Sequence, residues 1–192
     1  MRTVLPRWRS RAKLSVWWLV SLCLGGLAVG GCAHTGLAPS KGGFVRCINA
    51  ASDYSIAYPA DWKANTTGQL EPCRFFHPSD FEVQPGTEEP PLAVSVKRES
   101  LSLGEFIQGN TGPGNEVLQQ ESVTIAGQPA VRLELRTTEQ SALLPPGVRE
   151  YVYAVAAGSN SVIRVGTVEA PGLDYERDKD AVDQMVRTLL LR

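Results

Sequence analysis

Two histidines, His34 and His77, are the side chains best suited by their pKa to act as a general base in nucleophilic catalysis. His34 lies in a run of small and polar residues, so a serine or cysteine triad would depend on His77 alone. The sequence has no Gly-x-Ser-x-Gly elbow, no Gly-x-x-x-x-Gly-Lys-Ser/Thr phosphate loop and no His-Glu-x-x-His helix. We therefore expect His77 to be a strand-end or surface residue and the protein not to be an enzyme.

Four carboxylates, Asp80, Glu82, Glu88 and Glu89, gather around Pro85-Gly86. Groups of this kind bind calcium or act as paired acids in catalysis. The segment has no repeated Asp-x-Asp spacing and no glycine at a ligand-loop position. We interpret it as a solvated loop, and we predict neither a metal nor a cofactor.

The N-terminal segment has the layout of a secretory signal. Five basic residues and no acid occur in residues 1–13, and residues 14–31 carry no charge. This apolar run approaches the length of a minimal membrane span, so a retained anchor is the alternative. Its end is rich in glycine and alanine, which a signal peptidase accepts and a spanning helix does not need.

Val29-Gly30-Gly31-Cys32, at the end of this run, resembles the lipobox of bacterial lipoproteins. The resemblance implies cleavage before Cys32, a diacylglycerol group on the Cys32 thiol, and often an acyl group on the new amino terminus. The alternative is a chance cysteine after an ordinary signal peptide. Lipidation predicts an envelope protein on the outer face of the cytoplasmic membrane or on the outer membrane. The residue after Cys32 is Ala33, not the aspartate that in some bacteria retains lipoproteins at the inner membrane.

The chain is expected to contain a signal peptide over residues 1–31, a lipidated flexible tether over residues 32–43, and one globular domain over residues 44–192. Five of the 19 basic residues and none of the 20 acidic residues precede Cys32. The chain from Cys32 onward therefore carries 14 basic and 20 acidic residues, a formal charge of −6. Bulk charge of this sign argues against nucleic acid and against an anionic lipid surface as partners bound through overall charge.

Cys47 and Cys73 are the cysteines that remain once Cys23 is removed with the signal and Cys32 is lipidated. In an oxidising envelope such a pair is most simply a disulfide. Two free thiols or a metal site are the alternatives, and the wide spacing without a nearby histidine disfavours zinc.

Alternation of apolar and polar residues predicts strands at residues 54–58, 92–97 and 131–136. Two antiparallel hairpins are expected. Strands over residues 121–125 and 129–136 flank Ala126-Gly127, and strands over residues 150–156 and 161–168 flank Gly158-Ser159-Asn160. A short helix should begin at Ser102, whose spacing to Glu105 fits a capping box. A longer helix is predicted over residues 174–190, with an apolar stripe against the sheet. The elements predict an α+β fold, an antiparallel sheet packed between helices.

Tyr54-Ser55-Ile56-Ala57-Tyr58-Pro59-Ala60-Asp61-Trp62 resembles the strand, proline and tryptophan that open the domain of the PsbP-like superfamily, which includes envelope lipoproteins of the LpqN type. The order of the later elements supports the resemblance. It implies an α/β/α sandwich and a role in binding or assembly, with no catalytic residue to carry over.

Leu143-Leu144-Pro145-Pro146, in the connection between two predicted strands, places apolar side chains on rigid backbone. If exposed, Leu143, Leu144, Pro145 and Pro146 are the best candidate contact for a partner. The alternative is that the leucines cap one end of the core.

The sequence thus predicts a non-enzymatic binding or assembly lipoprotein whose partner is an envelope protein or a small ligand. The competing functions are a carrier of an apolar ligand or lipid, which needs a cavity between sheet and helix, and a hydrolase that uses His77.

Overall fold

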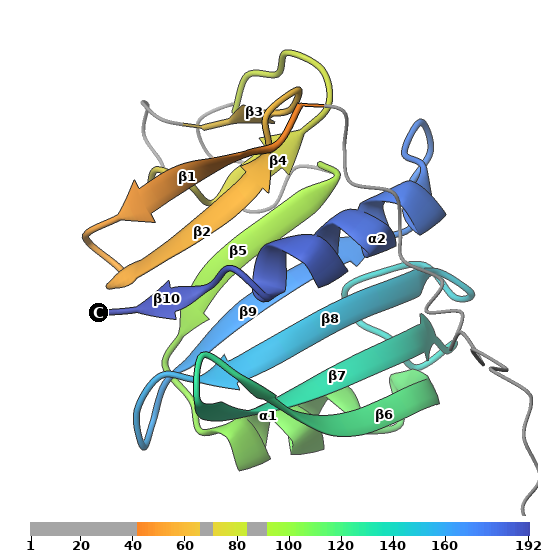
Figure 1. Cartoon of the computed structure of the whole chain (residues 1–192). Coiled ribbons are helices and arrows are strands. Elements are labelled where there is room, and N and C mark those ends of the chain that lie inside the picture. Colours follow the sequence, from red (N-terminus) through yellow and green to blue (C-terminus); the bar gives the residue numbers. More distant parts are fainter. Residues whose placement is uncertain (1–41, 66–70, 84–91) are drawn as a thin grey trace, which may run out of the picture. The chain divides into compact units, whose positions relative to one another are not determined.

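In the computed structural model, which describes residues 42–65, 71–83 and 92–192, seven strands form one antiparallel sheet (Figure 1). All described residues fall in one compact unit. Most of β7 alternates buried and less buried positions, whereas β8 and β9 are buried at consecutive positions, as expected for strands covered on both faces. In their order across the sheet, they are β3 (Lys63–Ala64), β4 (Phe75–His77), β5 (Val94–Glu99), β9 (Val162–Val168), β8 (Arg149–Ala156), β7 (Gln128–Thr137) and β6 (Asn115–Ile125).

Both predicted hairpins are confirmed. Ile125 pairs with Gln128, and the two residues between them, Ala126 and Gly127, have φ angles of 51° and 74°. Positive φ at both central residues is the geometry of the tight turn that matches the twist of paired strands. The second hairpin joins β8 to β9, with Gly158 at a φ of 132°.

A smaller sheet contains β1 (Phe44–Asn49), β2 (Tyr54–Pro59) and β10 (Leu190–Leu191), with β2 in the middle. Cys47 pairs with Ile56 and Asn49 with Tyr54, and the side chains of these four residues are buried. The inner face of this sheet therefore contributes to the core that it shares with the large sheet.

The short helix α1 (Leu103–Asn110) covers one face of the large sheet. The predicted capping box is confirmed: the Ser102 hydroxyl accepts from the Glu105 backbone N–H, and the Glu105 carboxylate accepts from the Ser102 N–H at 2.7 Å. Phe106 is the buried residue of this helix and packs with Leu133 and Leu135 of β7. The capping residues and one aromatic side chain thus fix a helix of eight residues.

The longer helix α2 (Tyr175–Val186) covers the opposite face, so the prediction of a sheet between helices is confirmed. Its buried Val182, Met185 and Val186 belong to the same core as Tyr54 and Ile56. Among the described residues, no helix has the length and apolar character needed to cross a membrane.

The prediction that this helix reaches residue 190 is wrong. After Val186 the backbone tightens, with Thr188 N–H bonded to Met185 O and Leu189 N–H bonded to Val186 O. The Thr188 hydroxyl accepts from the Ala57 N–H at 2.7 Å, which ties the chain to β2. Leu190–Leu191 then continues as β10. Leu189 continues the helical spacing in sequence but is buried after the helix has ended.

The predicted disulfide between Cys47 and Cys73 is confirmed. It joins β1 to the residue two positions before β4, and so links the small sheet to the large one. Cys73 has a φ of 63°, and its carbonyl accepts a hydrogen bond from the buried Tyr54 hydroxyl at 2.9 Å. The bridge and this hydrogen bond hold the two sheets together at one point.

Candidate functional site

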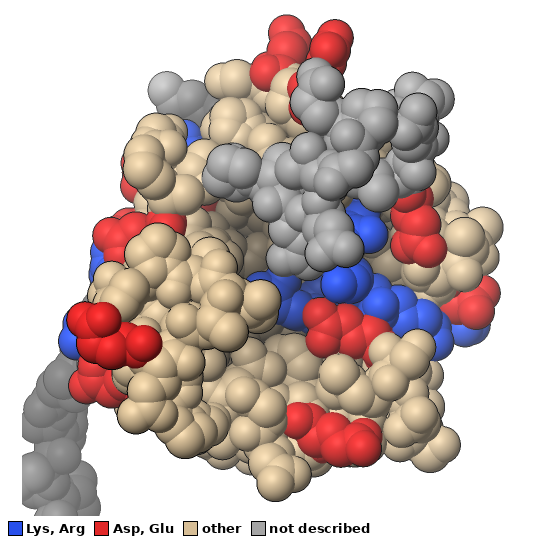
Figure 2. Space-filling model, turned by 180° about the vertical axis from the view of Figure 1, so that it is seen from behind, with Lys and Arg blue, Asp and Glu red and all other residues tan. Residues whose placement is uncertain are grey.

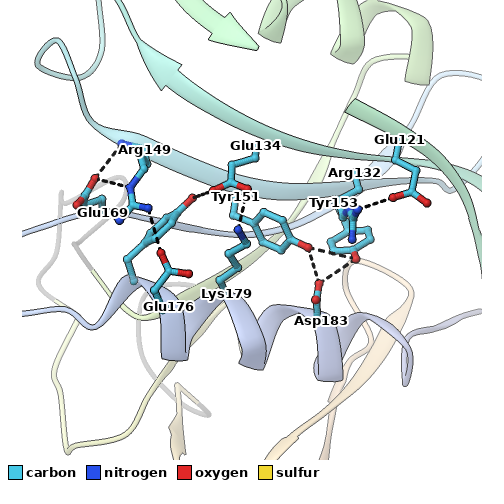
Figure 3. Close-up of polar contacts among 11 residues, drawn as sticks. Glu121, Arg132, Glu134, Arg149, Tyr151, Tyr153, Glu169, Glu176, Lys179 and Asp183 are labelled. Atoms are coloured by element: carbon cyan, nitrogen blue, oxygen red, sulfur yellow. Dashed lines mark hydrogen bonds and ion pairs between the residues drawn. The ribbon is translucent and has the colours of Figure 1, made fainter. Parts of the chain in front are cut away.

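Polar side chains from β6, β7, β8 and α2 meet between the helix and the large sheet (Figure 3). At their centre the Asp183 carboxylate accepts hydrogen bonds from the hydroxyls of Tyr151, at 2.7 Å, and of Tyr153, at 2.8 Å. The two rings are perpendicular, with their centroids 5.8 Å apart. Tyr151 and Tyr153 are two residues apart on β8, so alternation points both toward α2.

A second group connects the first half of α2 to β7. The Glu134 carboxylate accepts from Lys179 Nζ at 2.7 Å and from the Tyr175 hydroxyl at 3.4 Å. The Lys179 ammonium also lies 4.8 Å from the centre of the Tyr151 ring. These contacts join the two groups into one cluster.

Arg149, at the start of β8, supplies the third group. Its guanidinium donates to Glu169 at 3.1 Å and to Glu176 at 3.0 Å, and lies 4.2 Å from the centre of the Tyr175 ring. Arg132 of β7 forms an ion pair with Glu121 of β6 at the other end of the cluster. Each carboxylate of the cluster therefore has a partner within the domain.

The tyrosines of this cluster act as hydrogen-bond donors. Burial raises the pKa of Tyr151 and of Tyr153, and for both the Asp183 charge acts in the same direction. Burial and then the Glu134 charge raise the pKa of Tyr175. Phenols with raised pKa values stay protonated at neutral pH. The cluster is thus suited to hold α2 on the sheet, and we assign it a structural role.

The sequence analysis missed this cluster, since Tyr151 and Asp183 are far apart in the chain. One signal was present: Arg132 and Glu134 alternate with apolar residues on β7, so two charges had to lie on one face of a strand. In an antiparallel sheet covered on both faces, such charges need partners from the covering helix.

The predicted partner loop, residues 143–146, is on the surface. Leu143 is 93% exposed, Pro145 and Pro146 are exposed, and Leu144 is partly buried. The alternative in which both leucines cap the core is therefore wrong for Leu143.

Hydrogen bonds hold this loop in place. The Thr137 hydroxyl, at the end of β7, donates to the Pro145 carbonyl and accepts from the Val148 N–H at 2.9 Å. The Thr137 carbonyl accepts from the Gly147 N–H at 2.9 Å. The Thr138 N–H bonds to Gly114 O at 3.0 Å, which fixes the loop to the chain before β6. The backbone that carries Leu143 is thus anchored on both sides.

Cys32, Glu88 and Glu89 lie outside the described residues. His77 is the last residue of β4, and its Nδ1 accepts a hydrogen bond from the Ser79 N–H at 3.0 Å. Asp80 is exposed and forms an ion pair with Lys63 at 3.6 Å. In the part of the chain that the structure describes, no group of three His, Cys, Asp or Glu side chains is placed to hold a metal ion.

Asp178, in the first half of α2, is a buried carboxylate that the sequence did not suggest. Its Oδ1 accepts from Arg177 Nε at 2.8 Å and from Arg177 Nη2 at 2.7 Å. Its Oδ2 is buried without a hydrogen-bond partner among the described residues. Burial raises the pKa of Asp178, while the charges of Arg177 and His77 oppose that rise.

The face of the large sheet that carries α1 has a band of basic side chains (Figure 2). On this face Lys97 of β5 lies opposite Arg164 of β9. Arg164 is buried, forms an ion pair with Glu150 of β8 and donates to the Ser95 hydroxyl at 3.1 Å. The Arg164 charge is thus compensated between strands of the sheet.

No protein-family model matches the sequence, and no curated protein sequence matches it. The structure is similar to the solution structure of the cyanobacterial PsbP protein, CyanoP, of Synechocystis sp. PCC 6803, with 14% identity, coverage of 85% of this chain and 99% of that chain, and a TM-score of 0.44. It is also similar to the Ran-binding protein Mog1p of Saccharomyces cerevisiae, with 14% identity, coverage of 77% and 95%, and a TM-score of 0.46. A crystal structure from Bacteroides thetaiotaomicron VPI-5482 gives 12% identity, coverage of 77% and 48%, and a TM-score of 0.43, so this chain spans about half of that protein's length. The similarity to CyanoP and to Mog1p is distant.

Proposed function

We propose that this protein is a lipid-anchored binding module of the bacterial cell envelope, of the LpqN type. Its anchor is Cys32, on the strength of the charged-then-apolar segment and the lipobox resemblance before it. Two or more acyl chains give stable attachment to a membrane, whereas a single chain gives marginal binding. The module acts by contact with a partner and carries out no reaction.

The disulfide supports an envelope location. Structural disulfides form and persist in oxidising compartments, and thiols in the bacterial cytosol stay reduced. Cys47 and Cys73 are both buried, and their bridge spans 26 residues of sequence. A bridge of this kind fits a chain that folds after export.

The observation that carries the binding role is the exposure of Leu143 on an anchored loop. Covering an exposed leucine side chain with a partner stabilises the complex by about 25 cal/mol for each Å² of apolar surface removed from water. Because hydrogen bonds from Thr137 already fix the loop, little conformational entropy is lost when it binds. The partner is an envelope protein with an apolar pocket for Leu143, next to the exposed Pro145 and Pro146.

The anchor is tested by the intact mass of the full chain extracted from bacterial membranes, beside a Cys32→Ala variant. We expect the wild-type mass to equal residues 32–192 plus acyl groups, and the variant to lose both the acyl mass and the membrane attachment. A wild-type mass without acyl groups would overturn the lipoprotein function.

The partner contact is tested by replacing Leu143 with the photoreactive residue p-benzoylphenylalanine in the lipidated chain, in living cells. We expect one discrete protein adduct after illumination, and its loss when Pro145→Ser and Pro146→Ser are added. The matched control has the photoreactive residue at Leu190, which is exposed on a different sheet. Equal protein adducts from both positions, or none from position 143, would contradict a contact through this loop.

A further inference from the structure

The outer face of the small sheet exposes apolar side chains on neighbouring strands. Cys47 and Asn49 of β1 point into the core, so Phe44, Arg46 and Ile48 point outward. Ile48 and Leu190 both pair with Ser55, one from each side of β2. The exposed fractions are 40% for Phe44, 49% for Ile48 and 52% for Leu190.

The middle strand of this surface is covered by its neighbours. Ser55 and Ala57 of β2 lie on the same face but are buried, because the side chains of β1 and the segment after α2 cover them. Arg46 Nη1 donates to the Ser55 hydroxyl and to the Thr188 carbonyl, each at 3.1 Å. The outer face therefore offers an apolar layer with one fixed guanidinium at its centre.

The charge of this face differs from that of the domain. From Cys32 onward the chain has a formal charge of −6, yet no outward position of β1, β2 or β10 is acidic. Arg187, just after α2, and Arg192, just after β10, are exposed where the chain enters and leaves this sheet. Arg46, Arg187 and Arg192 outnumber the one exposed acid beside them, Asp53 of the β1–β2 turn, whose carbonyl accepts from the Arg192 N–H. Arginines beside apolar side chains are complementary to anionic headgroups above acyl chains.

The position of the anchor points to the same surface. Nine residues separate Cys32 from Gly42, and β1 begins two residues later, at Phe44. A chain of about ten residues spans at most about 35 Å. The lipid on Cys32 is therefore held close to the small sheet, at an effective concentration on the order of millimolar, at which weak apolar contacts are occupied.

We infer that the outer face of the small sheet rests on the phospholipid surface of the anchoring membrane, with Phe44, Ile48 and Leu190 in the headgroup region and Arg46 toward anionic lipid. This inference rests on the lipid anchor of the proposed function. In Figure 1 the small sheet and the connection between β7 and β8 lie on opposite sides of α2. A domain whose small sheet lies on the membrane would present Leu143 to a partner away from the lipid.

The test uses the lipidated mature chain in vesicles of phosphatidylethanolamine with phosphatidylglycerol. p-Benzoylphenylalanine replaces Ile48 in one sample, Leu190 in a second and Leu143 in a third. After illumination we expect phospholipid adducts by mass spectrometry at positions 48 and 190, severalfold above position 143. Thermal unfolding of each variant, compared with the wild type, shows whether the sheet is intact. If a variant fails to fold, the photoreactive residue is placed instead at Phe44, on the small sheet, with Val117 of β6 as the control position.

The outcomes separate the two proposals. Acyl mass on Cys32 with no lipid adduct from the small sheet overturns the membrane-facing surface and leaves the anchor standing. Adducts between two copies of the chain at positions 48 and 190 also overturn it, because the face would then be a dimer interface. An absent acyl mass overturns both proposals. Replacement of phosphatidylglycerol by phosphatidylcholine should lower the adduct yield severalfold in the wild-type background and by a smaller factor with Arg46→Gln, which retains Arg187 and Arg192.

Discussion

The Tyr151 hydroxyl lies 2.7 Å from the Asp183 carboxylate, and this hydrogen bond joins the middle of β8 to α2 (Figure 3). Tyr153 donates to the same carboxylate oxygen from two residues further along β8. One acceptor on the helix thus serves two donors on the sheet. The arrangement predicts that Asp183 contributes more to stability than either tyrosine hydroxyl.

Asp183→Ala should lower the free energy of unfolding by about 2 kcal/mol, because two largely buried hydroxyls lose their charged acceptor. Tyr151→Phe should cost about 1 kcal/mol, since Asp183 keeps its bond to Tyr153. Urea unfolding of the two single variants and the double variant measures the coupling between the residues. Asp180→Ala, on the same helix, is the control and should change stability by less than about 0.5 kcal/mol. A double variant whose cost equals the sum of the single costs would show that the two groups do not interact.

Gly166 of β9 should not tolerate a methyl group. A Cβ at this position would lie 2.8 Å from the backbone oxygen of Tyr151 and 3.1 Å from a methyl carbon of Val152. Gly166→Ala is expected to destabilise the fold by about 1 to 3 kcal/mol through overpacking. Thermal and urea unfolding measure the change.

At Gly109 of α1, the same change from glycine to alanine should increase the stability of the protein. A Cβ there meets no atom within 4 Å, and the residue is helical. Gly109→Ala should stabilise the protein by about 0.5 to 1 kcal/mol, because alanine loses less entropy than glycine in a helix. If both variants were equally destabilised, the close approach of β8 to Gly166 would not be the cause.

Loss of the disulfide should lower the free energy of unfolding by about 3 kcal/mol, because the unfolded chain gains conformational entropy when a loop of this length is no longer closed. The measurement is urea unfolding of a Cys47→Ser, Cys73→Ser double variant. Alkylation of the wild type without reductant, followed by intact mass, should find no label on Cys47 or Cys73. Two labelled thiols would contradict the bridge.

Asp178 should make the protein less stable as the pH rises. Its pKa is raised in the fold, above its ordinary value of 3.8, so the folded state binds a proton more tightly than the unfolded chain does. Its contribution to stability is therefore fully present below about 3.8 and is lost as the pH rises through the raised pKa. Asp178→Asn keeps an oxygen for Arg177 and removes the titration. The variant should gain stability relative to the wild type across this interval, measured by urea unfolding at several pH values; a difference independent of pH would contradict the burial argument.

The strongly periodic parts of the fold could be predicted from the sequence, because one pattern determines both conformation and burial. Val131, Leu133 and Leu135 alternate and lie on one face of β7. The first half of β6 was missed because a bulge interrupts its register between Val117 and Gln119, so the alternation shifts by one residue there. The last strand was missed because Leu189 and Leu190 fit a helical spacing, and contacts with the small sheet, such as the bonds to Thr188 from Ala57 and Arg46, divert the chain.

The disulfide could be predicted by counting cysteines, since only two remained. The loop of residues 143–146 could be located but its exposure could not be predicted, because the hydrogen bonds of Thr137 depend on a backbone turn that the loop sequence does not specify. The polar cluster on α2 depends on which residue of β8 lies opposite which residue of the helix. That information is tertiary, and no local pattern in the chain contains it.

The place of β2 between β1 and β10 has a consequence for the order of folding. β1 and β2 are the first described strands of the chain and pair as a local hairpin, whereas β10 is the last. One edge of β2 thus stays open until Leu191, five residues after the end of α2, has emerged from the ribosome or from a translocation channel. Closure of the small sheet is a late, long-range step, and such steps slow folding. A chain that cannot finish its fold while it is still emerging stays unfolded for longer, as the export in the proposed function requires.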